Sequence, residues 1–73
     1  MKTRKQIQKE IPNCTVMTLN EFIKDVKRGY LTPYDGYGYF HDGDKETDRP
    51  VMFGYGALVA ANITYPYVCW YNK

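Results

Sequence analysis

The stretch Thr18–Tyr30, TLNEFIKDVKRGY, is the one segment in which the start, the buried face and the end of a helix can all be read from the residues. Thr18 and Glu21 match the capping box, in which each side chain accepts a hydrogen bond from the backbone N–H of the other residue. Gly29 suits the left-handed closure of a helix. An apolar stripe at helical spacing is formed by Leu19, Phe22, Ile23 and Val26. The pattern predicts an amphipathic helix around which the other elements pack.

Several segments on both sides of this helix have the alternating, β-branched or aromatic composition of strands. The predicted strands are residues 14–17, 37–41, 49 or 51 to 55, and 63–71, and residues 57–61 are assigned to a strand in preference to a helical turn. Residues 42–48, DGDKETD, are predicted to be a charged loop that joins two of these strands in a hairpin. Pro66 removes a backbone donor, which predicts that the last strand lies at a sheet edge or carries a bulge.

These elements predict an α+β fold in which one amphipathic helix packs on a small antiparallel sheet of three or four strands. Residues 1–12 are expected to be a flexible basic arm or a short helix, because Ile7 and Ile11 are their only apolar pair at helical spacing. Residues 13–73 are expected to form a single α+β domain. A chain of 73 residues buries only about 60–65% of its unfolded surface, so a homo-oligomer is also expected.

The composition excludes several classes of protein. A net charge of +2 argues against an acidic mimic of DNA. Cys14 and Cys69 have no C-x-x-C spacing and no histidine cluster beside them, which argues against a zinc site and leaves open whether the two thiols pair. The loop DGDKETD lacks the glycine and the distal glutamate of a calcium-binding EF-hand loop. No metal or cofactor is therefore expected.

The chain has no apolar run long enough to span a membrane and no secretory signal at its start, so no membrane association and a cytoplasmic location are expected.

The content of eight tyrosines is the most unusual feature of the composition. Tyrosine combines an apolar ring with a polar tip, which suits a contact surface that is partly wet. The alternative is that the rings fill a thin core and a dimer interface. The acidic loop is predicted to contact a basic partner through Asp42, Asp44 and Glu46. The predicted binding residues are Tyr34, Asp35, Tyr37, Tyr39, Tyr65, Tyr67 and Trp70.

Catalysis is not expected from the available residue types. His41 beside Asp42 is the only place where acid–base chemistry could start, and neighbouring residues on a strand point to opposite faces. Cys14 and Cys69 are the only thiols, and the sequence pattern places no general base beside either of them. The basic arm carries only four positive charges, so nucleic-acid binding would be weak and is not favoured.

The order of a capped helix with a basic-Gly end, a D-G-x-G-aromatic strand and the ending Trp70-Tyr71-Asn72-Lys73 resembles, over residues 17–73, the small accessory proteins of bacteriophages. Several such proteins neutralise bacterial defences, either by occluding a host protein or by trapping a nucleotide signal in an oligomer. The resemblance implies a phage-encoded, non-catalytic inhibitor that binds a host defence protein in the bacterial cytoplasm. The alternatives are a sponge that sequesters a nucleotide in an aromatic pocket and a small nucleic-acid-binding protein.

Overall fold

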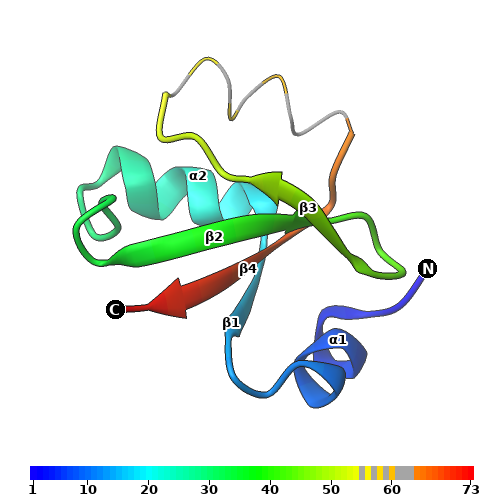
Figure 1. The fold of residues 1–73 in the computed structure, drawn as a ribbon. Coiled ribbons are helices and arrows are strands. Elements are labelled where there is room, and N and C mark those ends of the chain that lie inside the picture. Colours follow the sequence, from blue (N-terminus) through cyan, green and yellow to red (C-terminus); the bar gives the residue numbers. More distant parts are fainter. Residues whose placement is uncertain (55, 57, 59, 61–63) are drawn as a thin grey trace.

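The computed structural model describes residues 1–54, 56, 58, 60 and 64–73, and has an α+β fold in which helices α1 and α2 pack on a four-stranded antiparallel sheet (Figure 1). The strand order is β1-β4-β2-β3, and every neighbouring pair is antiparallel. The elements are α1 (Arg4–Glu10), β1 (Thr15–Thr18), α2 (Leu19–Lys27), β2 (Gly36–His41), β3 (Glu46–Pro50) and β4 (Tyr67–Asn72).

Helix α2 begins and ends at the predicted signals. The Thr18 N–H donates to Glu21 Oε1 at 2.9 Å and the Glu21 N–H donates to Thr18 Oγ1 at 3.1 Å, so the capping box is confirmed. Beyond the helix, Gly29 has φ of +81°, as the left-handed closure requires. These bonds satisfy two backbone donors that would otherwise lack a partner at the helix start.

The main core lies between α2 and one face of the sheet. The Phe22 ring is fully buried, with centroid distances of 5.6 Å to Trp70 and 5.9 Å to Phe53. This cluster is made of Leu19, Phe22, Phe40, Val51, Leu58, Val68 and Trp70. The face of the sheet that carries Phe40 and Trp70 is therefore largely covered at these positions.

Helix α1 covers part of the other face. Its Ile7 is fully buried in a second cluster with Cys14, Val16 and Cys69. Cys69 follows Val68 on β4, and successive strand residues point to opposite faces. The two helices therefore lie on opposite sides of the sheet.

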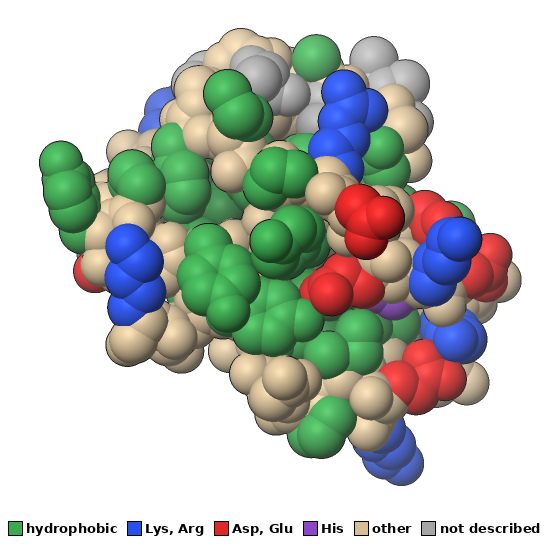
Figure 2. Space-filling model, viewed as in Figure 1, with side chains coloured by type: hydrophobic (Ala, Val, Ile, Leu, Met, Phe, Trp, Pro, Cys, Tyr) green, Lys and Arg blue, Asp and Glu red, His purple; other side chains and the backbone are tan. Residues whose placement is uncertain are grey.

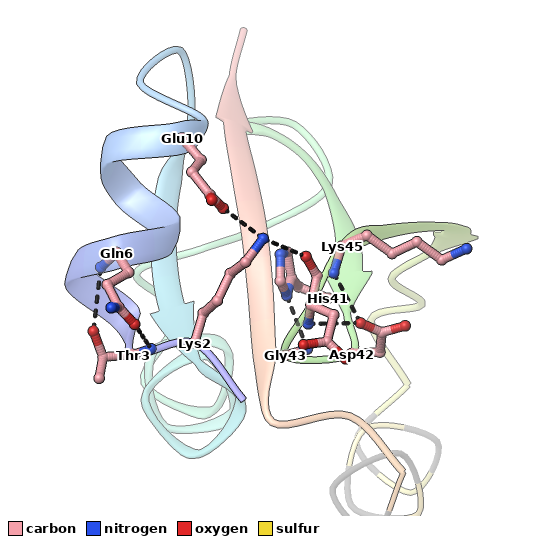
Figure 3. Close-up of polar contacts among 9 residues, drawn as sticks. Lys2, Thr3, Gln6, Glu10, His41, Asp42, Gly43 and Lys45 are labelled. Atoms are coloured by element: carbon pink, nitrogen blue, oxygen red, sulfur yellow. Dashed lines mark hydrogen bonds and ion pairs between the residues drawn. The ribbon is translucent and has the colours of Figure 1, made fainter.

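The N-terminus is fastened to the turn between β2 and β3, as the close-up in Figure 3 shows. The Lys2 N–H donates to the Gly43 carbonyl at 2.9 Å, and Lys2 Nζ donates to the Asp44 carbonyl at 2.9 Å while pairing with Glu10 at 3.0 Å. Of the flexible arm and the short helix expected for residues 1–12, the structure has the short helix α1, held against the sheet. The reason is that a single apolar side chain, Ile7, reaches a site formed by distant strands, which helical spacing alone does not show.

The position of β3 corrects the prediction of a strand from residue 49 or 51 to 55. The turn closes early because Asp42 Oδ1 accepts bonds from the N–H groups of Asp44 at 2.8 Å and Lys45 at 2.9 Å. The charged residues of Glu46–Pro50 therefore enter the sheet, although they were predicted in part as loop. Residues 51–54 have no strand assignment, and residue 55 lies outside the described residues.

The last strand also corrects a prediction, because β4 lies between β1 and β2 and not at an edge. The predicted strand at 63–71 is Tyr67–Asn72 in the structure. Pro66 comes just before it, and its carbonyl accepts from the Leu19 N–H at 3.0 Å. Its missing donor therefore leaves the ladder of β4 intact.

The strand predicted at 57–61 falls partly on residues 57, 59 and 61, which lie outside the described residues, as does residue 63. Gly56, Leu58 and Ala60 are described and have helical backbone. The Leu58 N–H donates to the Gly54 carbonyl at 3.1 Å, four residues back as in an α-helix. The strand prediction is therefore wrong for Leu58 and Ala60.

Candidate functional site

Three tyrosines gather on the part of the α1-side face that lies over β2 and β4. We call Tyr37, Tyr39 and Tyr71 the tyrosine cluster. Tyr37 and Tyr71 are register neighbours whose rings stack at 5.2 Å between centroids with 12° between planes. The Tyr39 ring meets both of them nearly edge-on, at 6.1 Å from Tyr37 and 6.4 Å from Tyr71. Figure 2 shows a continuous hydrophobic surface over this region.

The alternation of glycine and tyrosine in β2 explains why the cluster forms here. Tyr37 and Tyr39 point to one face, so Gly36 and Gly38 point to the other. On that other face the Trp70 ring lies so close that a Cβ at Gly38 would be 3.2 Å from its Cε3. Glycine thus makes room for tryptophan in the core while tyrosine occupies the outer face.

The cluster is partly exposed and has an acidic rim. Tyr37 keeps 51% of its surface in solvent. The Tyr71 hydroxyl donates to Glu46 Oε2 at 2.6 Å, and burial together with this bond raises the pKa of Tyr71 above its ordinary value. Asp48 is exposed and lies two residues beyond Glu46 on β3, in the stretch where the register of β2 with β3 shifts. Figure 2 shows acidic side chains at the β3 side of the hydrophobic surface.

The other predicted aromatic residues do not belong to the tyrosine cluster. Trp70 is only 2% exposed and belongs to the main core, so its prediction as a binding residue is contradicted for direct contact. Tyr65 stacks on Phe40 at the opposite face, with 4.7 Å between centroids. Tyr67 is half-buried, with its ring 6.2 Å from that of His41. One surface that contains all the predicted tyrosines is therefore not formed.

The predicted residues Tyr34 and Asp35 lie in the turn before β2. Tyr34 is 87% exposed. Asp35 Oδ2 accepts from the Thr32 N–H at 2.9 Å and from Thr32 Oγ1 at 3.0 Å. Asp35 thus holds the turn, while Tyr34 presents its ring to solvent.

The three predicted acidic contact residues have different surroundings. Asp42 Oδ1 is engaged by the turn, and the backbone N–H groups of Lys45 and Asp44 lower the pKa of its carboxyl. Asp44 is exposed and its carbonyl is held by Lys2. Only Glu46 touches the tyrosine cluster.

Tyr71 is the member of the cluster that the predicted binding set omits. A signal for it is present in the sequence, because Tyr67, Cys69 and Tyr71 alternate along one strand and must share a face. What alternation cannot show is that β2 lies beside β4 with Tyr37 opposite Tyr71, because this pairing joins residues far apart in the chain.

The thiols lie beneath this face. Cys14 and Cys69 are both free and buried, so the disulfide left open by the sequence is not formed. Burial raises the pKa of each thiol, which keeps it protonated at neutral pH. A protonated, buried thiol is a poor nucleophile.

His41, the one histidine, is 1% exposed, and its Nδ1 accepts from the Gly43 N–H at 3.0 Å (Figure 3). Burial lowers the pKa of its imidazole. The unfolded chain therefore binds a proton at His41 more readily than the folded chain does. The contribution of neutral His41 to the free energy of unfolding is fully present above pH 6.5 and is lost as the pH falls toward the folded pKa.

We expect the urea midpoint to fall between pH 7.5 and pH 5, by an amount that His41→Gln abolishes. The window isolates His41, because the pKa values of Glu21 and Asp42 are also lowered, from ordinary values of 4.5 and 3.8, so these carboxylates lose their stabilisation only at more acidic pH. A midpoint that is the same at both pH values would contradict this assignment.

Within the described residues, no group of three or more His, Cys, Asp or Glu side chains is placed to hold a metal ion. None of the helices in that part of the chain is long and apolar enough to cross a membrane. Comparison with protein-family models, with curated proteins and with solved structures found no match for the chain. The tyrosine cluster and its surroundings are therefore the candidate site from which a function is proposed.

Proposed function

We propose that this protein is a non-catalytic binding protein that contacts a partner protein through the tyrosine cluster. The observation that carries the proposal is the stacked arrangement of Tyr37 and Tyr71, with Tyr39 edge-on to both, on a partly exposed sheet face. Rings packed against each other lose little conformational freedom on binding, and tyrosine is enriched among the residues that dominate protein–protein affinity.

The rim of the cluster indicates the chemistry of the partner. Glu46 is held in place by Tyr71, and the exposed Asp48 is two residues further along β3. A carboxylate has more acceptor capacity than one hydroxyl uses. A lysine or arginine on the partner, next to an apolar segment that covers the rings, would complement this surface.

The same rim disfavours the alternatives of a nucleotide sponge or a nucleic-acid binder at this face. Both ligands carry phosphates and need a cation beside the stacking rings. Glu46 puts negative charge there instead, and the acidic residue Asp48 follows it on the same strand. The resemblance to phage accessory proteins extends the proposal to a bacterial defence protein as the partner, whose activity is blocked by occupancy of its surface.

A photo-crosslinking amino acid at position 37, with the same amino acid at position 20 as control, tests the proposal in bacterial cells. Asn20 is exposed on α2, on the opposite side of the sheet. We expect one protein to be captured from position 37 only, and to be captured less when Asp48→Lys is added than when Asp44→Lys is added. Capture of a second copy of this chain, equal capture from both positions, or no capture from position 37 would contradict the proposal.

Tyr37→Ala is expected to weaken binding of the purified captured partner by about 30-fold or more, the loss typical of a dominant interface residue. Tyr30→Ala is the matched control, because Tyr30 is 69% exposed and outside the cluster. Titration calorimetry measures both. The Tyr37 variant should stay folded, since the lost ring contacts are worth only about 0.5–1.5 kcal/mol. Equal affinities of the two variants would remove the cluster from the interface.

A further inference from the structure

A cavity of about 310 Å³ lies on the opposite side of the sheet from the tyrosine cluster. Its described walls come from β2, from β3 and from the segments on either side of residues 61–63. We call it the Arg49 cavity. Its lining includes Phe40, Arg49, Pro50, Met52, Thr64 and Tyr65. The volume is at the lower end of the range of about 300–1,000 Å³ found for small-molecule sites.

Two parallel rings form an ordered apolar wall of this cavity. Phe40 and Tyr65 stack with 4.7 Å between centroids and 12° between planes. The Phe40 ring is fixed in turn by the main core, of which it is a buried member. Aromatic groups pair favourably with such rings in offset-stacked or edge-to-face arrangements.

The charged member of the cavity is held in place by the same wall. Arg49 Nη1 donates to the Tyr65 hydroxyl at 3.3 Å, and the guanidinium carbon is 5.9 Å from the Tyr65 ring centroid. A guanidinium has five N–H donors, so one bond to a hydroxyl leaves most of them available.

No carboxylate among the described residues lies within ion-pair distance of Arg49. Its chain neighbour Asp48 is exposed and makes no ion pair with it. The positive charge at the cavity is therefore not neutralised by a described acidic side chain. A planar fork of donors with this charge suits a carboxylate or phosphate on a ligand.

We propose that the Arg49 cavity binds a small organic anion that joins a planar apolar group to a carboxylate or a phosphate. The planar group lies against the Phe40–Tyr65 wall, and the anionic group accepts hydrogen bonds from Arg49. This site is independent of the proposed protein partner, because the tyrosine cluster is on the other face. Binding of an anion in the Arg49 cavity therefore does not depend on whether the tyrosine cluster binds a partner protein.

Two-dimensional NMR titrations with adenosine 5′-monophosphate and with indole-3-carboxylate test the proposal. At least one probe should give saturable shifts at Arg49, Met52 and Tyr65, with a dissociation constant of about 1 mM or tighter. The uncharged analogues, adenosine and indole, should bind about tenfold or more weakly, because they lack the charge-assisted bonds. The response to one anion and not the other distinguishes a phosphate from a carboxylate ligand.

Arg49→Gln should weaken binding of the responding probe about tenfold or more, whereas Arg28→Gln removes the same charge from an exposed residue at the end of α2 and should leave it unchanged. Tyr37→Ala should also leave it unchanged. Absence of shifts for both probes, equal binding to the Arg49 variant, or shifts confined to Tyr37, Tyr39 and Tyr71 would overturn the proposal.

Discussion

Phe22→Ala is expected to lower the free energy of unfolding by about 3–5 kcal/mol, the usual loss when a buried phenylalanine is truncated. Phe22 is fully buried. Its ring contacts Trp70 on β4 and Phe53 in the segment that follows β3, so it joins α2 to both. Alanine at this position removes both ring contacts and leaves a cavity that neighbours fixed in a sheet cannot fill completely.

The effect is large compared with the total stability. At about 0.05–0.15 kcal/mol per residue, a chain of 73 residues is stable by only about 4–11 kcal/mol. Urea unfolding followed by the fluorescence of the one tryptophan, which is in contact with Phe22, measures the loss. Tyr34→Ala is the control and should change stability by no more than about 0.5 kcal/mol, since its side chain is 87% exposed. A loss below about 1 kcal/mol for the Phe22 variant would contradict the packing of α2 described above.

The parts of the fold that could be predicted are those determined by residues close in the chain. The capping box of Thr18 and Glu21 and the closure at Gly29 involve bonds and backbone angles within a few residues, so the start and end of α2 follow from the sequence. The alternation of faces along β2 and β4 follows equally from local geometry.

The errors arise where distant residues decide the outcome. The hydrophobic run after Pro50 resembles a strand more than the charged residues before it do, yet the side chain of Asp42 closes the turn so early that Glu46–Pro50 pair with β2. The central place of β4 depends on pairing with both β1 and β2. The composition of β4 alone does not indicate either of these pairings.

The same distinction applies to the candidate site. Residues Tyr37 and Tyr39 share a face by alternation, so their association is predictable. Their association with Tyr71 and the separation of Tyr65 are not, because they depend on which strands are neighbours and on where β4 begins. Aromatic content alone thus indicated a contact surface but overestimated its extent.

Gly36→Ala is expected to lower the free energy of unfolding by about 3 kcal/mol or more, at the upper end of the cost of inserting a methyl group into a packed site. A Cβ at Gly36 would overlap the backbone carbonyl oxygen of Tyr71 and would lie 2.9 Å from Trp70 Cζ2. The carbonyl belongs to β4, whose pairing with β2 cannot adjust without moving the strands apart. The conformation of Gly36 is not the cause, because its φ is not positive.

Gly54→Ala is the matched control, since a Cβ at Gly54 meets nothing within 4 Å and its φ is also not positive. Urea unfolding should place this variant within about 0.5 kcal/mol of the unchanged protein. The Gly36 variant should also lose affinity for the captured partner, because the residue next to it, Tyr37, is the register neighbour of Tyr71. Near-ultraviolet circular dichroism of the tyrosines reports the altered stack directly. If Gly36→Ala were as stable as Gly54→Ala, the close pairing of β2 with β4 would be wrong, and the tyrosine cluster would lose the arrangement that supports its proposed role.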